Sequence, residues 1–314
     1  MTTYVIRRVL ALIPVLIVVS LITFALMHLA PGGPFDQVDE TRRRDPAIQQ
    51  RAEAAFGLNK PWYEQYFTYM SNAVRLNLGP SYSYKDRNVT DLLKEHIRYS
   101  AELGVMAVIF AVLFGLPLGV IAALRQNTWV DYLALFLATM GVAIPSFVLS
   151  LYLILLFSST LHWVDVAPDQ QAFDTTLKPW ILPVLALGLP TSAALARFAR
   201  SAMLDVIRQD YIRTARAKGL RNQVIVARHM VKNAMIPVWT IIGPLTAGLV
   251  TGSFIVEDIF SIPGIGRYFV SAIGARDYSM IMGTTLVYCL LVIIFNLLTD
   301  VTYGLFDPRV KVSK

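Results

Sequence analysis

The sequence is poor in the residues from which most metal sites, disulfides and redox centres are built. It contains one cysteine, Cys289, and four widely spaced histidines, none of them in a His-Glu-x-x-His pattern. A single cysteine excludes a disulfide or a cysteine-rich metal site within one chain, and isolated histidines give no local sign of a metal cluster. We therefore expect this chain to hold no metal and no cofactor.

Motifs for phosphate binding and nucleophilic catalysis are also lacking. The sequence has no G-x-x-x-x-G-K-[ST] loop and no G-x-S-x-G elbow. Gly264-x-Gly266 follows no strand of a βαβ unit, so it predicts no dinucleotide site. An intramembrane enzyme would need ionisable residues at mid-membrane, but His28 and Asp300 lie near the ends of apolar segments. We expect a non-catalytic chain with no catalytic residues.

Charged residues are scarce, at 16% against 55% hydrophobic residues, and the mean hydropathy is +0.55. A helix that crosses a bilayer needs about 20 consecutive apolar residues. Blocks of at least 18 residues without Asp, Glu, Lys or Arg occur at Val9–Ala30, Leu103–Leu124, Tyr132–Leu161, Pro179–Ala196, Asn233–Val256 and Tyr278–Thr299. The sequence therefore predicts an all-α integral membrane protein with six transmembrane helices. The third block is long and must tilt, kink at Pro145 or extend beyond the lipid.

The first block has some features of a secretory signal peptide, because Arg7 and Arg8 precede an apolar run. The run is too long for a signal core, however, and no good small-x-small cleavage site follows it at His28-Leu29-Ala30-Pro31. We expect a retained membrane helix.

The distribution of Lys and Arg predicts the orientation of the six spans. Fifteen of these residues lie at the two termini and in the second and fourth connections, against three in the third and fifth connections. Cytoplasmic loops carry the excess of basic residues. Both termini are therefore expected in the cytoplasm of a multi-pass protein, and the long first connection, residues 31–98, outside.

The first connection is nearly neutral, with ten basic and nine acidic residues, and we expect a small helical cap. Helices opened by proline are predicted at Pro46 to Phe56 and Pro61 to Leu76. An aromatic cluster in the second helix suits either the membrane interface or a local core. Its members are Trp62, Tyr63, Tyr66, Phe67 and Tyr69.

The fourth connection, residues 197–236, is strongly basic, with nine basic and two acidic residues from Arg197 to Lys232. A helical spacing of apolar residues predicts one apolar face, formed by Leu204, Ile207, Tyr211 and Ala215. Gly219 is expected to end this helix, and a second amphipathic stretch follows from Asn222 to Ala234. Such a projection suits docking on another protein. Anionic lipid is an alternative partner, whereas sparse aromatic residues argue against nucleic acid.

This loop resembles the coupling loop of ATP-binding-cassette importer permeases, in the form found in the peptide and nickel branch. The resemblance rests on the run from Tyr211 to Leu220, on His229, and on Asn233-Ala234-Met235-Ile236-Pro237. Arg213-Thr214-Ala215 stands where the general motif has Glu-Ala-Ala, and the final Ile-Pro lies farther from Gly219 than in that motif.

Further segments of the chain are similar to the same family. They are Ile6-Arg7-Arg8, Leu29 to Pro34, Thr251-Gly252-Ser253 through Glu257, Phe260 to Arg267, Arg276-Asp277-Tyr278 and Asp307-Pro308-Arg309. Asn77 to Asp86 and Ile121 to Thr128 resemble the oligopeptide permease B-subunit branch in particular.

The resemblance implies a single transmembrane domain, residues 1–314, with the type I importer permease fold, in the bacterial cytoplasmic (inner) membrane. It implies a second homologous permease subunit, two ATPase subunits that bind ATP and Mg, an external peptide-binding protein and a peptide substrate. The coupling residues would be Tyr211, Arg213, Thr214, Ala215, Arg216, Ala217, Lys218, Gly219 and Leu220. Arg213, Arg216 and Lys218 suit pairing with the ATPase, and Ala215 and Ala217 suit close approach.

The translocation path is predicted from the mildly polar face of the fifth span, formed by Thr246, Thr251 and Ser253. Ordinary helix packing explains these residues equally well. Gly115-x-x-x-Gly119 and Gly248-x-x-x-Gly252 predict close helix crossings. A secondary transporter would not need the basic loop and would show inverted repeats, so the open alternative is a different cargo: dipeptides, nickel or another small solute.

Overall fold

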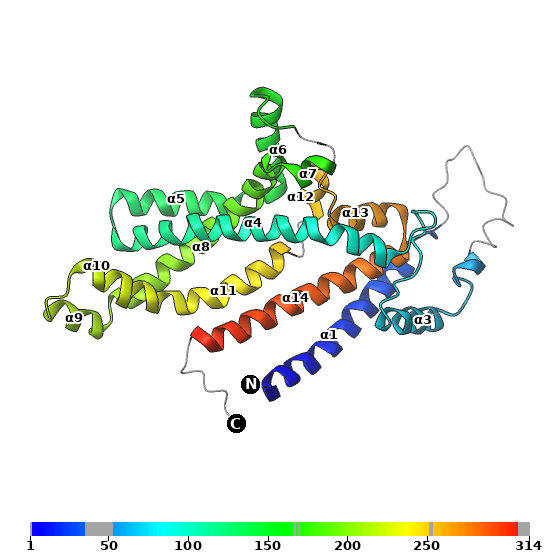
Figure 1. The fold of residues 1–314 in the computed structure, drawn as a ribbon, viewed down its shortest axis with the longest axis horizontal. Helices are drawn as coiled ribbons and strands as arrows, with labels where there is room; N and C mark the ends of the chain where they lie inside the picture. The colour runs from blue at the N-terminus through cyan, green and yellow to red at the C-terminus, as the bar shows by residue number, and fades with distance from the viewer. Residues whose placement is uncertain (1, 35–52, 166–167, 169, 251–253, 307–314) are drawn as a thin grey trace. The chain divides into compact units, whose positions relative to one another are not determined.

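The computed structural model describes residues 2–34, 53–165, 168, 170–250 and 254–306 (Figure 1). Its regular secondary structure is helical, as the sequence predicts. The chain divides into two compact units. The first comprises Tyr99–Pro263 with Leu291–Lys314, and the second comprises Thr2–Arg98 with Gly264–Leu290. Two long helices, α4 (Val89–Leu124) and α14 (Tyr278–Phe306), each contribute residues to both units.

Four helical segments are long and apolar enough to cross a membrane: Val89–Leu124, Lys178–Ile207, Asn222–Val250 and Tyr278–Thr299. A fifth arises if the bent pair Trp129–Ala143 and Ser146–Thr160 forms one span. The first predicted span lies in α1 (Thr2–Leu29), of which Ile13–Leu29 forms a shorter apolar stretch. The structure therefore contains four or five candidate spans within its described residues, and a sixth stays a prediction.

The third predicted span is sharply bent. Helix α5 (Trp129–Ala143) ends before Pro145, and α6 (Ser146–Leu153) begins after it, with 99° between the two segments. Proline removes a backbone donor and clashes with the preceding turn. Of the three alternatives that the length of this block left open, the structure shows the kink at Pro145. By contrast, α11 (Lys232–Val250) continues through both Pro237 and Pro244.

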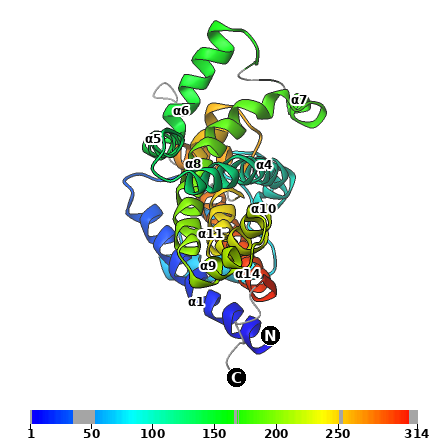
Figure 2. The same ribbon diagram turned by 90° about the vertical axis from the view of Figure 1, so that its left-hand side faces the viewer.

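In the first unit, α4 crosses α8 (Ile181–Ile207) through small residues. A Cβ atom added at Gly115 would meet the backbone of Ser192, and one added at Gly119 would meet the backbone of Ala196. Glycine at both positions therefore lets the two backbones approach closely, which confirms the predicted role of the Gly115-x-x-x-Gly119 pair. Figures 1 and 2 also show α5 lying along α8.

Short elements complete the first unit. They are η1 (Ile154–Thr160), α7 (Gln170–Thr175), η2 (Lys178–Trp180), α9 (Asp210–Ala217), α10 (Asn222–Val224), η3 (Ile225–Val231) and α12 (Phe254–Ile259). One apolar core joins residues of α4, α6, α7, α8 and α12, including Leu103, Leu182 and Val256. A second core joins α8 to the segment from α9 to α11. That second core positions the basic loop.

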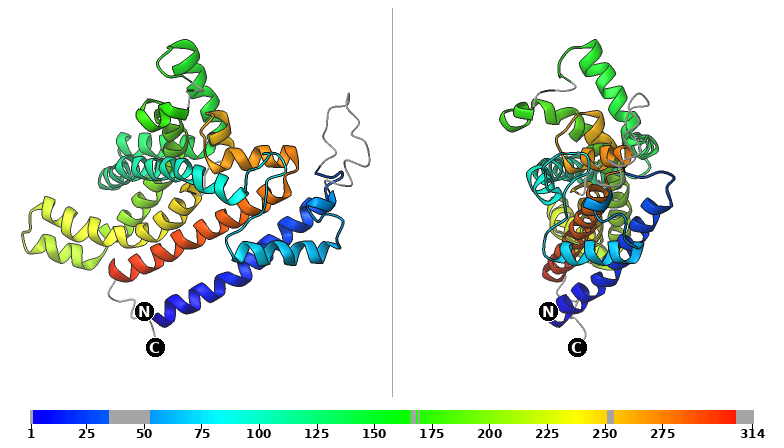
Figure 3. Two further views of the ribbon diagram at one scale, coloured as in Figure 1. Left: turned by 45° about the vertical axis from the view of Figure 1, so that its right-hand side comes forward. Right: turned by 90° about the vertical axis from the view of Figure 1, so that its right-hand side faces the viewer.

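The second unit packs α1 against α3 (Trp62–Val74), as both panels of Figure 3 show. The hydroxyl groups of Ser20 and Tyr66 lie 2.9 Å apart across this contact. The unit also contains α13 (Ile265–Ala275) and the first parts of α4 and α14. Its core includes Leu78, Leu92 and Met280.

One of the two helices predicted for the cap is present, whereas the cap itself stays a prediction. Helix α3 begins directly after Pro61, close to the predicted boundary. Most of the other predicted cap helix, from Pro46 to Phe56, lies outside the described residues, although residues 53–55 are helical. The aromatic cluster has two faces, since Tyr66 is buried whereas Trp62 and Phe67 are exposed. The local core therefore holds for Tyr66, and an interface stays a prediction for Trp62 and Phe67.

Candidate functional site

The predicted coupling loop forms a helical hairpin at one end of the first unit, at the left of Figure 1. Helix α8 ends at Ile207, α9 runs from Asp210 to Ala217, and a turn through Gly219 leads to α10. Asp210 lies in the first turn of α9 and Arg216 in its last. Charges in these positions complement the helix dipole, so the local sequence favours this short helix.

Two inward-facing residues anchor α9. Ile212 is fully buried and Ala215 is 6% exposed. They join a core with Met203 of α8, Met230 of η3 and Val238 of α11. Because this anchor reaches the helices on both sides of the loop, displacement of α9 must disturb α8 and α11 as well.

The prediction of the apolar face of this loop is wrong about which residues of α9 point inward. The sequence spacing places Tyr211 on that face, but its side chain is 42% exposed. The helix is interrupted at Arg208 and Gln209, between α8 and α9. The 3.6-residue period therefore restarts at Asp210, and Ile212 takes the inward position. Ala215 is inward as predicted, so it packs inside this chain and does not offer the close approach to a partner expected of it.

The outward face of the loop carries the other predicted coupling residues. Tyr211, Arg213, Thr214, Arg216, Ala217, Lys218, Gly219 and Leu220 are all exposed. The guanidinium of Arg213 lies 3.5 Å from the Asp210 carboxylate, a surface pair one helical turn apart. Exposed pairs of this kind contribute little to stability, about 0–1 kcal/mol. Most of the positive charge here therefore faces the solvent.

Gly219 has the backbone conformation predicted for a residue that ends a helix. Its φ is +73°, and an added Cβ atom would meet nothing within 4 Å. Lys218 is the C-cap residue of α9, which places Gly219 at the following position. The left-handed conformation, not crowding, therefore favours glycine here.

A buried ion pair joins α8 to the first turn of α5. The guanidinium of Arg200 donates from Nε to Asp131 Oδ1 at 2.6 Å and from Nη2 to Asp131 Oδ2 at 2.7 Å. The backbone N–H of Asn127 also donates to this carboxylate, at 3.0 Å. Asp131 is only 1% exposed. Bidentate pairing adds orientation as well as energy, and sequence reasoning missed it because the two residues are 69 positions apart.

The predicted path residues are described in part. Thr246 is half-buried, and its hydroxyl donates to the carbonyl of Ile242 in the same helix at 2.7 Å. A Cβ atom at Gly243 would overlap the side chain of Thr299, whereas one at Gly248 would meet nothing within 4 Å. Thr251 and Ser253 lie outside the described residues. Gly243 thus serves packing, and Gly248 faces open space.

The second unit contains a buried carboxylate that sequence reasoning did not single out for its chemistry. Asp277 is fully buried. Its Oδ2 accepts hydrogen bonds from the Ser81 hydroxyl and from the N–H groups of Tyr82 and Ser83, and its Oδ1 accepts one from the N–H of Met280. An Asp directly before an apolar helix is a typical N-cap signal, and this rule would have found its bond to Met280.

Burial also affects the tyrosines near this carboxylate. It raises the pKa of Tyr82, with a smaller contribution from the charge of Asp277. Burial likewise raises the pKa of Tyr69 far above that of a free phenol. Both phenols are therefore neutral at physiological pH. Among the described residues, no group of three or more His, Cys, Asp or Glu side chains is arranged to hold a metal ion.

The fold resembles that of solved ABC transporters. It is similar to the MetNI methionine ABC transporter in an inward-facing conformation, with a TM-score of 0.55 and 18% identity, over 69% of this chain and 96% of that one. An amino acid ABC transporter with histidines gives a TM-score of 0.50 and 16% identity, over 70% of this chain and 95% of that one. The architecture is thus that of an ABC importer permease.

Sequence comparisons identify the family. Residues 115–312 match the family of binding-protein-dependent transport system inner membrane components, and residues 1–87 match the N-terminal region of such components. The chain is 42% identical to the dipeptide transport system permease protein DppB of Bacillus subtilis, over 100% of this chain and 99% of that protein. It is 41% identical to the oligopeptide transport system permease protein OppB of Escherichia coli K12, over 99% of this chain and 100% of that protein.

The chain therefore belongs to the family of binding-protein-dependent transport system inner membrane components. It is a non-catalytic, multi-pass permease of the inner membrane, and a transporter of this family works with ATPase and binding-protein partners.

Proposed function

We propose that this chain is one of two permease subunits in an ATP-driven importer of oligopeptides and that it forms half of the translocation path. Its full-length similarity to peptide permeases supports a peptide cargo. The alternative cargoes are dipeptides, nickel or another small solute. One of the similar relatives bears the name of a dipeptide permease, which keeps the dipeptide alternative open.

The observation that carries the proposal is the construction of α9. Its inward residues Ile212 and Ala215 belong to a core shared with α8 and α11, while its outward residues present basic side chains. A partner that moves α9 therefore moves two neighbouring helices with it. In the proposed mechanism, ATPase subunits that bind ATP and Mg hold this helix, and their closure switches the path between inward-open and outward-open states.

The proposal includes an orientation. The excess of basic residues at the two termini and in the second and fourth connections supports a cytoplasmic location for α9 and both termini, by the positive-inside rule. The segment from residue 31 to residue 98 is then outside, where an external binding protein delivers the cargo. Thr246, Thr251 and Ser253 stay candidates for the path. Gly248, two residues after Thr246 in the sequence, faces open space.

Uptake by the reconstituted complex with its binding protein tests the cargo. Vesicles containing the complete complex should accumulate a labelled pentapeptide in an ATP-dependent manner, and excess unlabelled dipeptide or nickel should compete weakly. Efficient competition by dipeptides would assign the chain to dipeptide transport. A lack of uptake of any peptide would refute the peptide cargo altogether.

The coupling role is tested by reversing one charge on the outward face of α9. Arg216→Glu should reduce transport and cargo-stimulated ATP hydrolysis at least about tenfold, because a repelling carboxylate replaces an attractive contact with the ATPase. Arg125→Glu is the matched control, since Arg125 is also exposed and lies in a loop expected on the same side. Equal loss in both variants would attribute the effect to net charge and refute a docking role for α9.

A further inference from the structure

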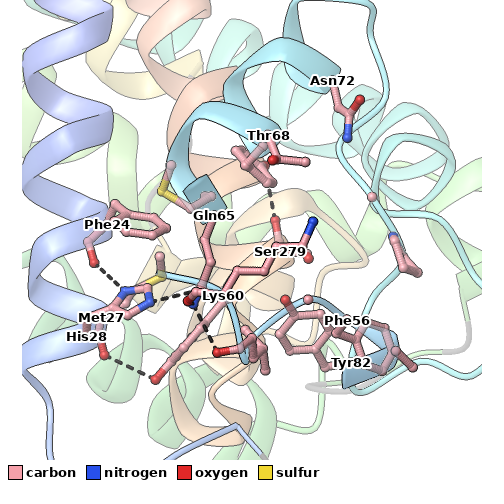
Figure 4. Close-up of a pocket in the computed structure, with 18 residues that line it drawn as sticks. Phe24, Met27, His28, Phe56, Lys60, Gln65, Thr68, Asn72, Tyr82 and Ser279 are labelled. Atoms are coloured by element: carbon pink, nitrogen blue, oxygen red, sulfur yellow. Dashed lines mark hydrogen bonds between the residues drawn. The ribbon is translucent and has the colours of Figure 1, made fainter. Parts of the chain in front are cut away.

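The second unit contains a cavity of about 220 Å³ (Figure 4). Five segments form its wall: the end of α1, the chain from residue 55 to residue 60, helix α3, the loop around Tyr82, and the start of α14. The residues contributed by α1 and α14 lie near the ends of those helices that the proposed orientation places outside. The cavity therefore opens at the side of the membrane from which cargo arrives.

Much of the wall is aromatic. The rings of Phe56 and Tyr82 lie 4.6 Å apart, and those of Tyr82 and Tyr278 lie 6.4 Å apart. Phe24, Met27 and Met282 extend this lining. For scale, an apolar cavity of about 150 Å³ holds one benzene molecule. The cavity is thus large enough for one aromatic or bulky aliphatic side chain.

Hydrogen bonds hold the wall in place without a ligand. The Gln65 amide donates to the carbonyls of Leu58 and Lys60, at 3.0 and 2.7 Å. The His28 ring contacts the Phe24 carbonyl at 2.9 Å, and the Tyr278 hydroxyl donates to the Met27 carbonyl at 3.2 Å. A wall fixed in this way needs little ordering when a ligand enters, which favours binding.

The charge of the lining selects the kind of ligand. Among the described residues that line the cavity, Lys60 has the one charged side chain, and none is acidic. Asn72 and Thr68, both exposed, add an amide and a hydroxyl. An aromatic pocket with an amide, a hydroxyl and a cation suits an apolar side chain attached to a backbone with carbonyl and carboxylate groups.

We propose that this cavity is a subsite that receives an aromatic or bulky apolar side chain of the incoming peptide, with the peptide's carbonyl and carboxylate groups facing Asn72 and Lys60. This inference rests on the proposed function, because it takes peptides as the cargo. It adds a preference that belongs to the permease itself, separate from that of the binding protein. A lipid tail fits less well, since it offers no partner for the polar groups of Lys60, Thr68 and Asn72 in the lining.

The chain offers a matched pair of variants for the test. Ala54 and Ala55 are adjacent and both exposed, but only Ala55 lines the cavity. Ala55→Trp should fill the cavity, and Ala54→Trp adds the same side chain outside it. Thr68→Trp and Ser71→Trp form a second pair on α3, in which only Thr68 lines the cavity. The test can therefore still be made if one variant fails to assemble.

The measurement is equilibrium dialysis of labelled tripeptides against the complete complex in nanodiscs without its binding protein. Wild type and Ala54→Trp should bind Ala-Phe-Ala at least about tenfold more tightly than trialanine. Ala55→Trp should abolish this preference. The inference is overturned if wild type shows no preference, if both variants lose it equally, or if Ala55→Trp keeps it.

Uptake of trialanine separates this inference from the proposed function. If every variant imports trialanine when the binding protein is present but wild type shows no aromatic preference in dialysis, the subsite is refuted and the peptide cargo stands. If neither the wild-type complex nor any variant imports any peptide, the proposed function itself is refuted.

Discussion

The loop around α9 and the loop from residue 77 to residue 88 are both held against neighbouring helices, but by different interactions. Each must hold a connection firmly against a helix bundle. The α9 loop is held by apolar burial of Ile212 and Ala215. The other loop is held by the buried carboxylate of Asp277, which accepts hydrogen bonds from three groups of Ser81, Tyr82 and Ser83.

The kind of interaction that holds each loop determines what its other residues can do. An apolar anchor is non-directional, so the outward residues of α9 are free to carry charge for a partner. A buried carboxylate fixes the positions of specific backbone groups, because hydrogen bonds depend on geometry. The second arrangement keeps Tyr82 in place beside the cavity.

Loss of the buried carboxylate should have the largest effect. Asp277→Ala leaves four donors without their acceptor, and we expect the free energy of unfolding to fall by about 3–5 kcal/mol. Thermal unfolding of the complex in nanodiscs measures it. Asp91→Ala, at an exposed position in the first turn of α4, should cost less than about 1 kcal/mol. Similar losses in both variants would show that the Asp277 network does not hold the loop.

Loss of the apolar anchor should come next. Ile212→Ala should lower the free energy of unfolding by about 2–4 kcal/mol, through lost burial and the cavity left behind. Transport should also fall, because α9 loses its hold on α8 and α11. Tyr211→Ala is the neighbouring exposed control and should change stability by no more than about 0.5 kcal/mol. A larger effect at Tyr211 than at Ile212 would contradict the inward assignment of Ile212.

The turn after α9 should show a smaller effect. Gly219→Ala forces a side chain into left-handed backbone at a cost of about 1–2 kcal/mol, and ATP hydrolysis should respond less to cargo. Gly32→Ala introduces a comparable strain in the other unit, because the φ of Gly32 is +92° and this residue does not line the cavity. It should destabilise to a similar extent and leave the coupling ratio unchanged. If Gly32→Ala also uncouples transport from ATP hydrolysis, the turn has no special role.

The smallest effect should appear at alkaline pH. Burial raises the pKa of Tyr82 above its ordinary value of 10.0, so the folded state keeps a proton that the unfolded state releases. This stability is fully present below pH 10 and is lost as pH rises through the raised pKa. Between pH 10 and pH 11, the free energy of unfolding should therefore fall by up to about 1 kcal/mol less in Tyr82→Phe than in wild type. Unchanged pH dependence, after normalisation at pH 7, would contradict the burial of this phenol.

Local sequence signals predicted the elements that depend on local chemistry. Pro61 marks the start of α3, Pro145 marks a sharp bend, and Gly219 adopts a positive φ after α9. Each of these follows from the backbone restrictions of a single residue. The close approach at Gly115 and Gly119 also followed from spacing, since residues four apart share a helix face.

The inward face of α9 was missed because its phase depends on where a helix breaks. The spacing of Leu204, Ile207 and Tyr211 assumes one continuous helix, but the chain breaks at Arg208 and Gln209. Nothing in the local propensities of those two residues fixes that break. The core shared with Met203 and Met230 favours it instead, by burying Ile212.

The sequence alone determined the class of the protein, its helical character and the loop that carries its positive charge. These follow from composition and from periodic patterns along the chain, which need no knowledge of distant contacts. The tertiary structure alone decided which groups meet across long separations. Three features join residues far apart in sequence: the ion pair of Asp131 with Arg200, the hydrogen bond from Ser81 to Asp277, and the cavity beside Tyr82. Such contacts have no local signal, because they exist only once the helices have packed.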